Sequence, residues 1–263
     1  MDDQTHKNGL KKQFIMKTRL SDIPTTAPEG ASKKSYKEET DRLVRRLGEL
    51  QNIMYAEGKY SMLVILQGMD GSGKDGAVRN VFSECSIAGL DLVSFKKPTE
   101  EEFAHDFLWR VHRWAPQKGM TTIFNRSHYE DILIQRVHGW ISSERVEKRM
   151  AAINSFEELL QFDNNTLIFK FYMHISHEEQ GVQLQQRLDD KSKYWKHNAG
   201  DWEERKLWDK YMEAYEYAIN ESNIPWHICP VDNRWYRDYF IAKTLVDTLE
   251  KLDMSLPTPE KVS

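Results

Sequence analysis

Short apolar runs and longer helical patterns alternate along most of the chain. From Tyr36 to Glu57, apolar residues recur at steps of three and four, which is the period of an amphipathic helix. Five short apolar or β-branched runs follow, separated by helical stretches: 62–67, 91–95, 121–124, 167–173 and 226–231. Strands that alternate with helices at this spacing are typical of βαβ units, which form a parallel sheet covered on both faces. The pattern therefore predicts one α/β domain with a five-stranded parallel sheet.

The two ends of the chain differ from its middle. Residues 1–36 are polar and contain two prolines, which predicts an arm that lies over the body or over a neighbouring subunit. The predicted domain covers 37–255, and residues 256–263 are predicted to be a tail. Within the domain, 181–200 mixes helix formers, basic residues and a glycine. This mixture is what a mobile helical lid that excludes water from a phosphoryl-transfer site would require.

Composition and charge narrow the functional classes. The 37 basic and 41 acidic residues give a net charge of −4, so any site for a polyanion must be made by local clustering. Cys85 and Cys229 match no metal or redox spacing. The N-terminus lacks the apolar region of a signal peptide, and no stretch approaches the roughly 20 apolar residues of a membrane span. We therefore expect a soluble, cytoplasmic protein without a nucleic-acid or membrane partner.

A glycine-rich segment, LQGMDGSGKDG, follows the first predicted strand at residues 66–76. Its glycines and lysine keep the G-x-x-x-x-G-K spacing of a P-loop (Walker A). Because the segment lies between a strand and a helix, its amides and the positive end of that helix converge on one point. The alternative, a glycine-rich turn with an incidental lysine, does not explain this placement. The predicted phosphate-binding residues of the loop are Gly71, Ser72, Gly73, Lys74 and Gly76.

Two acids, Asp70 and Asp75, stand in this loop, and Asp75 replaces the usual Ser or Thr. Carboxylates repel bare phosphate, whereas Mg²⁺ binds carboxylate oxygens on one side and phosphate oxygens on the other. We therefore predict that both acids bind Mg²⁺, and the sequence leaves Mn²⁺ open as a substitute. For Asp70, orienting an attacking phosphate oxygen is a second role. For Asp75, capping the following helix is an alternative.

A second polar cluster, NRSHYED, begins at Asn125, where the third predicted strand ends. P-loop enzymes usually present a metal-ordering aspartate at such a position. Because Asn125 is neutral, we predict that the metal-binding carboxylates are those of Asp70, Asp75 and Glu130. Ser127 and His128 are adjacent and lack a G-x-S-x-G elbow, so they do not indicate a hydrolase.

Basic residues follow several of the predicted strands. Guanidinium groups bind phosphate oxygens in a bidentate manner, so Arg126 and Arg136 are predicted to face the phosphate path. Arg187, in the predicted lid, is a further candidate for phosphate binding. Together these positions suggest a basic groove for a long anion, with further contributions from Lys96, Lys97, Arg110, Arg113, Lys191, Lys193 and Lys196.

The combination of GMDGSGKDG, NRSHYED and RLDDKSKYWKHNAGDWEER resembles the polyphosphate kinase 2 family, over about residues 43–252. The resemblance implies a P-loop kinase of thymidylate-kinase-like fold that transfers a phosphoryl group between inorganic polyphosphate and a nucleotide, with Mg²⁺. It also implies a homo-tetramer and a lid arginine at Arg187. The catalytic residues that it implies are Asp70, Lys74, Asp75 and Arg126.

Many members of that family read D-R-S-W-Y-N where this chain has NRSHYE at 125–130. The version here resembles the subgroup that phosphorylates AMP as well as ADP, and by this resemblance Glu130 marks the broader acceptor range. Asn125 and Glu130 are thus the candidate acceptor residues. The implied nucleotides are AMP, ADP and ATP, while base selectivity, including guanine nucleotides, stays open.

Two other functions are weighed against this one. A nucleoside monophosphate kinase with ATP as donor would share the fold, but Asp75 and the spread of basic residues argue against it. A nucleotide-binding switch protein would need an N-K-x-D segment and a D-x-x-G after a strand. The chain has no N-K-x-D, and its one D-x-x-G lies inside the P-loop.

Overall fold

The computed structural model describes residues 17–259. Its centre is a parallel sheet of five strands in the order β2-β3-β1-β4-β5. The strands are β1 (Ser61–Gln67), β2 (Leu90–Ser94), β3 (Thr121–Asn125), β4 (Thr166–His174) and β5 (Trp226–Pro230). Each overlaps one of the five predicted runs, so the predicted parallel sheet is confirmed.

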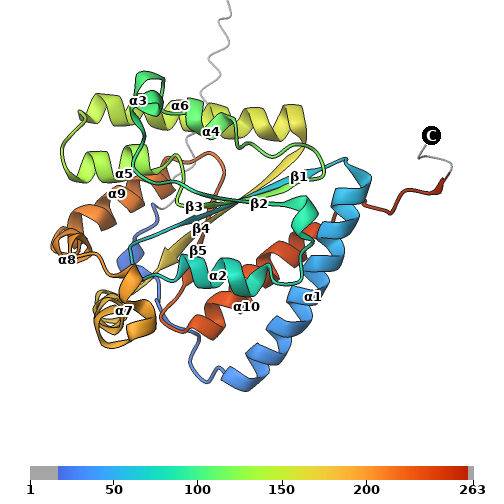
Figure 1. Cartoon of the computed structure of the whole chain (residues 1–263), viewed down its shortest axis with the longest axis horizontal. Helices are drawn as coiled ribbons and strands as arrows, with labels where there is room; N and C mark the ends of the chain where they lie inside the picture. Colours follow the sequence, from blue (N-terminus) through green and yellow to red (C-terminus); the bar gives the residue numbers. More distant parts are fainter. Residues whose placement is uncertain (1–16, 260–263) are drawn as a thin grey trace, which may run out of the picture.

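Helices cover both faces of the sheet (Figure 1). α1, α2 and α10 lie on one face, α3 to α6 and α9 lie on the other, and α7 and α8 stand at one end. The α-helices are α1 (Lys33–Glu57), α2 (Lys74–Val81), α3 (Glu100–Ala104), α4 (Trp109–His112), α5 (Glu130–Val137), α6 (Ser143–Asn164), α7 (His177–Asp189), α8 (Gly200–Arg205), α9 (Trp208–Asn220) and α10 (Arg234–Leu249). Three short 3-10 helices complete the set: η1 (Leu20–Asp22), η2 (Ile87–Gly89) and η3 (Lys191–Lys196). The predicted three-layer α/β architecture is confirmed.

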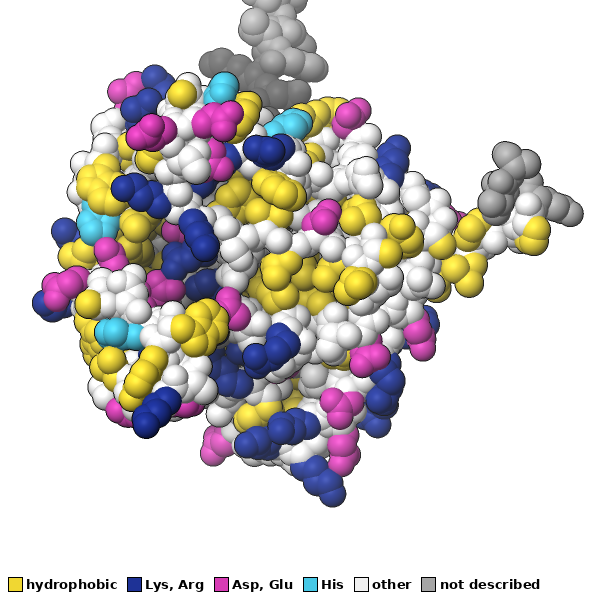
Figure 2. Space-filling model, viewed as in Figure 1, with side chains coloured by type: hydrophobic (Ala, Val, Ile, Leu, Met, Phe, Trp, Pro, Cys, Tyr) yellow, Lys and Arg dark blue, Asp and Glu magenta, His cyan; other side chains and the backbone are white. Residues whose placement is uncertain are grey.

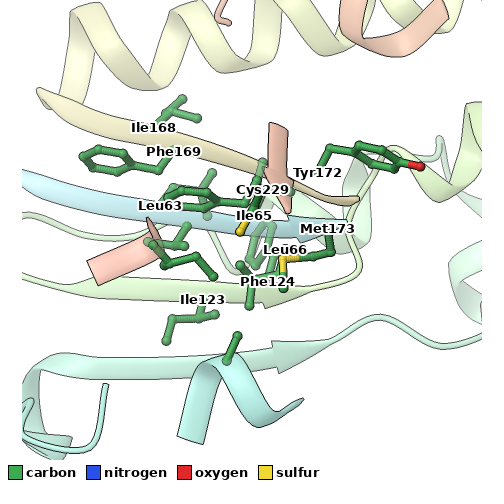
Figure 3. Packing of buried hydrophobic residues seen from close by; sticks show 14 of the residues in the cluster. Leu63, Ile65, Leu66, Ile123, Phe124, Ile168, Phe169, Tyr172, Met173 and Cys229 are labelled. Atoms are coloured by element: carbon green, nitrogen blue, oxygen red, sulfur yellow. The ribbon is translucent and has the colours of Figure 1, made fainter. Parts of the chain in front are cut away.

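The core is centred on β1, the middle strand. All seven residues of β1 are buried, because helices cover both faces of the strand and other strands flank both of its edges. Val64 pairs with Ile123 of β3 and with Phe169 of β4. Figure 3 shows such side chains stacked across the sheet. Because both faces of β1 are buried, the run at 62–66 is apolar at every position rather than at every second one.

The first helix begins three residues earlier than the predicted Tyr36. The side chain of Ser32 accepts a hydrogen bond from the Ser35 amide and caps the helix, so α1 starts at Lys33. The helix ends at Glu57 and is capped by Gly58, which has a left-handed conformation with φ of 65°. The face predicted to be apolar packs against α10, and its buried members include Leu43, Leu47, Leu50 and Met54.

The described part of the N-terminal segment lies against the body of the chain. The amide of Leu20 donates to Glu216 of α9 at 2.7 Å, and the Leu20 side chain is buried. The hydroxyl of Thr25 donates to Asp232 at 2.7 Å. Residues 1–16 of the predicted arm, and 260–263 of the predicted tail, lie outside the described residues.

The parallel order brings the carboxyl ends of the strands to one edge of the sheet. The loop 68–73 follows β1, residues 126–129 follow β3, and α7 begins after β4. The predicted phosphate loop and the NRSHYED cluster therefore meet at this edge. Between residues 17 and 259, none of the helices combines the length and apolar character needed to cross a membrane.

Candidate active site

The loop after β1 has the backbone shape of a phosphate-binding loop. Gly71 and Gly73 have φ angles of 86° and 83°, which side chains other than hydrogen strongly disfavour. Gly73 is the N-cap of α2, which begins at Lys74, as predicted. The amino end of this helix, with its unpaired amides, points at the space in front of the loop.

Lys74 is buried within the loop. Its ammonium group donates to the carbonyl oxygens of Gly68 at 2.7 Å and Met69 at 3.1 Å. Burial lowers the pKa of Lys74 to about 8, and the charge of Arg126 acts in the same direction. The nearby carboxylates of Asp70, Glu130 and Asp75 offset part of this effect.

Asp70 and Arg126 form an ion pair across the site. One guanidinium nitrogen of Arg126, Nη2, lies 2.6 Å from Oδ1 and 2.7 Å from Oδ2 of Asp70. Burial by itself raises the pKa of Asp70, but the charges of Lys74 and Arg126 outweigh it, and the pKa lies below its usual value. Asp70 is therefore an anion at neutral pH.

Asp75 does not cap α2, because Gly73 holds that position and Asp75 lies in the first turn. Instead its carboxylate accepts from Asn125 Nδ2 and from Lys196 Nζ, each at 2.8 Å. Burial tends to raise the pKa of Asp75, but the hydrogen bonds from Lys196 and Asn125 bring it below the usual value. Each acid of the loop thus faces a basic side chain, Arg126 for Asp70 and Lys196 for Asp75.

Glu130 lies on the other side of Arg126. Arg126 Nη1 is 3.4 Å from Glu130 Oε2, and the buried amide of Gln67 donates to Glu130 Oε1. The oxygen of the same amide accepts from Ser127 Oγ at 3.1 Å. Gln67, at the end of β1, therefore holds both Ser127 and the first turn of α5 in place.

Arg126 has a positive φ of 62°, which is unusual for a residue other than glycine. Such strain persists when the surroundings hold the backbone in place. Directly after Arg126, the fully buried His128 and Tyr129 both contact Glu157 of α6, at 3.2 and 2.9 Å. Lys170 of β4, also fully buried, donates to Glu157 at 2.6 Å. This buried network anchors the chain that carries Arg126.

A cavity of about 180 Å³ lies in front of the loop. It is lined by Asp70, Gly71, Gly73, Lys74, Asp75, Gly76, Gln183, Arg187, Lys193 and Lys196. Four of these side chains are basic and two are acidic. Figure 2 shows Lys and Arg side chains gathered between the α5–α9 side and the α7–α8 side of the molecule. Basic residues from 181–200 therefore face the phosphate loop directly.

Arg187 of α7 lines this cavity and is held by an ion pair with Asp201 of α8. Arg136 is not brought to the cavity. Its guanidinium group lies over the ring of Tyr217, 4.6 Å from the centroid, between α5 and α9. Ser72 belongs to the loop, but its side chain is fully buried and does not line the cavity.

The three candidate metal ligands are not gathered around one point. Among residues 17–259, no group of three or more His, Cys, Asp or Glu side chains is arranged to hold a metal ion. Mg²⁺ commonly takes one or two carboxylates and completes its shell with substrate phosphates and water. Asp70 and Asp75 fit that mode because they line the cavity, although each is also paired with a basic side chain, whereas Glu130 does not line the cavity.

A second cavity, of about 610 Å³, lies between α3, α4, α5 and α6. Phe103 and Trp140 expose aromatic surface at its wall. Deeper, Arg110 lies 3.6 Å from the buried Asp131, which also accepts from Gln135 at 2.7 Å. Asp131 Oδ2 has no hydrogen-bond partner among the described residues. The cavity thus combines exposed rings with a polar base, as sites for small molecules often do.

Sequence reasoning missed several residues that shape the loop. Gln180 of α7 donates to the Asp70 carbonyl at 3.0 Å, and Arg234 and Arg237 of α10 donate to loop carbonyls. The signal in the sequence is weak, because it consists of two arginines three positions apart at the start of the helix after β5. Their partners are backbone atoms more than 160 positions away, which no local pattern shows.

Comparisons with known proteins identify the family of the chain. The family model described as "Polyphosphate kinase 2 (PPK2)" matches residues 30–257. An AMP/ADP-polyphosphate phosphotransferase of Meiothermus ruber is 47% identical over 248 residues, which cover 93% of this chain and 92% of that protein. An ADP-polyphosphate phosphotransferase of Rhodopseudomonas palustris is 39% identical and covers 94% and 92% of the two chains.

The fold is likewise similar to a solved structure. The crystal structure of polyphosphate kinase 2 from Arthrobacter aurescens TC1 superposes with a TM-score of 0.89 and 40% sequence identity. The match covers 92% of this chain and 89% of that one. Because the family model spans most of the chain and the relatives match it nearly end to end, this protein belongs to the polyphosphate kinase 2 family.

Proposed function

We propose that the protein catalyses Mg²⁺-dependent phosphoryl transfer between inorganic polyphosphate and adenine nucleotides, making ADP from AMP and ATP from ADP. Membership of the family and the names of the two relatives support polyphosphate and adenine nucleotides as the substrates. The observation that carries the proposal is the phosphate loop, whose cavity is lined by basic residues from the loop and from 181–200.

The charge of the loop cavity suits a chain of phosphates better than a single phosphate group. Lys74 lies inside the loop, and Arg187, Lys193 and Lys196 approach from the opposite wall. Lys193 and Lys196 lie on η3 and add two positive charges to the cavity lining, more than a single phosphate group needs. We propose that residues 181–200 act as a lid, which closes over polyphosphate and excludes water during transfer.

The acceptor nucleotide would occupy the second cavity. This cavity lies between segments that follow the carboxyl ends of β2 and β3, where α/β folds bind ligands. The rings of Phe103 and Trp140 suit a stacked base. The acceptor's phosphate would then point toward Arg126, which precedes α5 and contacts the loop, and toward Glu130, the first residue of α5.

Phosphoryl transfer between phosphates needs positioning and charge stabilisation more than acid–base chemistry, because the attacking phosphate oxygen is already an anion. Lys74 and Arg126 would neutralise the oxygens of the transferring group. Asp70 would hold the guanidinium of Arg126 in place, and Asp70 and Asp75 would bind Mg²⁺. When bound, Mg²⁺ supplies charge neutralisation between the carboxylates and the phosphate oxygens.

The family resemblance also supports a homo-tetramer in the cytoplasm, and both are part of the proposal. Light scattering after size-exclusion chromatography measures the assembly directly, and a mass of one or two chains would contradict it. Guanine nucleotides and Mn²⁺ are tested as substitutes in the same activity assay.

The decisive experiment is ATP formation from ADP and long-chain polyphosphate with Mg²⁺ and no other donor. We expect ATP to form, to be abolished by EDTA, and to be restored by excess Mg²⁺. The parallel reaction with AMP should give ADP first. Turnover with ATP and AMP but none with polyphosphate would favour an ordinary monophosphate kinase and overturn the proposal.

A further inference from the structure

We propose that Arg234 and Arg237, at the start of α10, are positioning residues that hold the phosphate loop in its binding shape by donating to its carbonyl groups. The inference rests on the proposed phosphate-binding role of the loop. Neither residue lines the loop cavity, so both would act through the backbone of the loop rather than on substrate.

The two arginines bind three successive carbonyls of the loop. Arg234 donates from Nη2 to the Gly71 carbonyl at 2.6 Å and from Nη1 to the Ser72 carbonyl at 2.5 Å. Arg237 donates from Nη1 to the Gly73 carbonyl at 3.0 Å. A rigid, planar guanidinium can engage two neighbouring carbonyls at once, which an ammonium group cannot do with the same geometry.

The remaining carbonyls of the loop are bound as well. Lys74 donates to those of Gly68 and Met69, and Gln180 donates to that of Asp70. Every carbonyl from residue 68 to residue 73 therefore accepts from a side chain. The N–H and C=O groups of one peptide unit point in opposite directions. Because the carbonyls of Ser72 and Gly73 are held by α10, the amides of Gly73 and Lys74 in the same peptide units turn toward the cavity that these two residues line, which favours an anion there. The amide of Ser72 instead donates within the loop to the Met69 carbonyl at 3.2 Å.

The arginines also bring charge behind the loop. Arg237 is 3% exposed, and its charge is partly balanced by Asp238 at 2.8 Å. Arg234 forms no ion pair with the carboxylates of residues 17–259. Burial, together with the charge of Arg237, lowers the pKa of Arg234 to about 10, so it stays charged at neutral pH. Both charges therefore favour an anion on the far side of a single layer of backbone.

Gly73 shows how closely the arginines approach. A Cβ at this position would collide with the guanidinium groups of Arg234 and Arg237. We call the contacts of Arg234 and Arg237 with the loop carbonyls the brace. Glycine is therefore required at 73 for the brace as well as for the positive φ. This contact links the C-terminal helix, which follows β5, to a loop that follows β1.

The test uses Arg234→Lys, which keeps the charge but loses the paired contact, and Lys243→Met as a control that removes an exposed charge from the same helix. The KM for long-chain polyphosphate, the KM for ADP, kcat and the melting temperature are measured for each. Hydrogen exchange of the peptide covering 68–76 is followed by mass spectrometry. Binding of inorganic tripolyphosphate is measured by calorimetry.

We expect Arg234→Lys to raise the KM for polyphosphate about tenfold or more, because contacts from charged donors are lost. The KM for ADP should change less than about twofold, and exchange should accelerate within 68–76 but not in β4 or α6. Lys243→Met should match the parent chain. An unchanged KM for polyphosphate with unchanged exchange overturns the inference, and so does an equal rise in both KM values. If Arg234→Lys does not fold, Arg237→Lys, which loses one loop contact instead of two, is judged by the same criteria.

Failure of the proposed function has a different signature. If the parent chain does not use polyphosphate as a donor, tripolyphosphate binding still reports on the loop. Weaker binding and faster loop exchange in Arg234→Lys would then support the brace although the donor is another phosphate compound. Equal binding and equal exchange in both chains would overturn the brace itself.

Discussion

Arg126 Nη2 lies within 2.7 Å of both carboxylate oxygens of Asp70, so an acid of the phosphate loop is directly linked to the segment after β3. The two residues are separated by 56 positions, and they meet because β1 and β3 are neighbouring parallel strands. The link explains how an acid is accommodated in a loop built for anions. Asp70 is paired with a basic side chain of the same site.

Asp70→Asn tests this link. The amide cannot hold Arg126 as an ion pair and is a poor ligand for Mg²⁺, so we expect kcat to fall by about 10²-fold or more, with the melting temperature nearly unchanged. Asp247→Asn, which alters an exposed ion-paired aspartate on α10, is the matched control and should keep full activity. Near-normal kcat in Asp70→Asn would refute the assigned role.

Glu130 is predicted to govern the choice between AMP and ADP. Glu130→Asn loses the contact with Arg126 and shortens the side chain that Gln67 holds. We expect kcat/KM for AMP to fall at least about tenfold more than that for ADP. Glu38→Asn on α1 serves as the control. Equal losses with both acceptors would contradict the prediction.

The second cavity is predicted to bind the base of the acceptor. Phe103 has 60% of its surface exposed at this wall, and stacking of a base on an aromatic ring contributes about 1–3 kcal/mol. Phe103→Ala should therefore raise the KM for AMP about tenfold and leave the KM for polyphosphate unchanged. Phe162→Ala, which removes an exposed ring from α6 outside the cavity, should change neither. A larger effect on polyphosphate than on AMP would place the acceptor elsewhere.

The lowered pKa of Lys74 predicts that the use of polyphosphate depends on pH. Its pKa is lowered to about 8, so the charged form that binds phosphate is complete well below pH 8 and is lost as the pH rises through this value. Since kcat/KM reports the free enzyme, kcat/KM for polyphosphate should decline above about pH 8. Lys74→Arg keeps its charge throughout this range and should lack that decline. If Lys74→Arg is inactive, tripolyphosphate binding across the same pH range provides the comparison. A profile that is flat from pH 7 to 9.5 in the parent chain would exclude the assignment.

The buried ion pair between Glu157 and Lys170 is predicted to stabilise the fold beneath Arg126. Breaking such a pair leaves an uncompensated buried charge, so Glu157→Met should cost about 3–5 kcal/mol in the free energy of unfolding, measured in urea. The double variant Glu157→Met with Lys170→Met should recover part of this loss. The exposed pair Glu144–Lys148 should contribute less than about 1 kcal/mol. A loss of less than about 1 kcal/mol in the free energy of unfolding for Glu157→Met would show that the buried pair does not stabilise the fold.

Local chemistry explains which parts of the fold could be predicted. The run at 62–66 is apolar at every position because β1 is covered on both faces, and this marks a central parallel strand. Gly71 and Gly73 are needed where the backbone takes positive φ, and Lys74 follows at the helix start. Strand, loop and helix start are each decided by residues close in sequence, so the pattern alone located them.

Other features of the site could not be predicted in this way. Arg136 has the same chemistry as Arg126, yet it lies on Tyr217, because its position on α5 turns it toward α9. Asp75 was a reasonable helix cap by composition, but Gly73 took the cap and Asp75 faces Asn125 and Lys196. In both cases the side chain's role depends on which distant element packs beside it.

The sequence by itself determined the family, the parallel sheet and the phosphate loop, since each follows from spacings and side-chain types within one or two adjacent elements. Only the tertiary structure decided the partners of the site residues. Lys196 meets Asp75 across 121 positions, and Arg234 meets the Ser72 carbonyl across 162. Such contacts depend on the order of strands and the packing of helices. Those depend on burial across the whole chain, which no local pattern encodes.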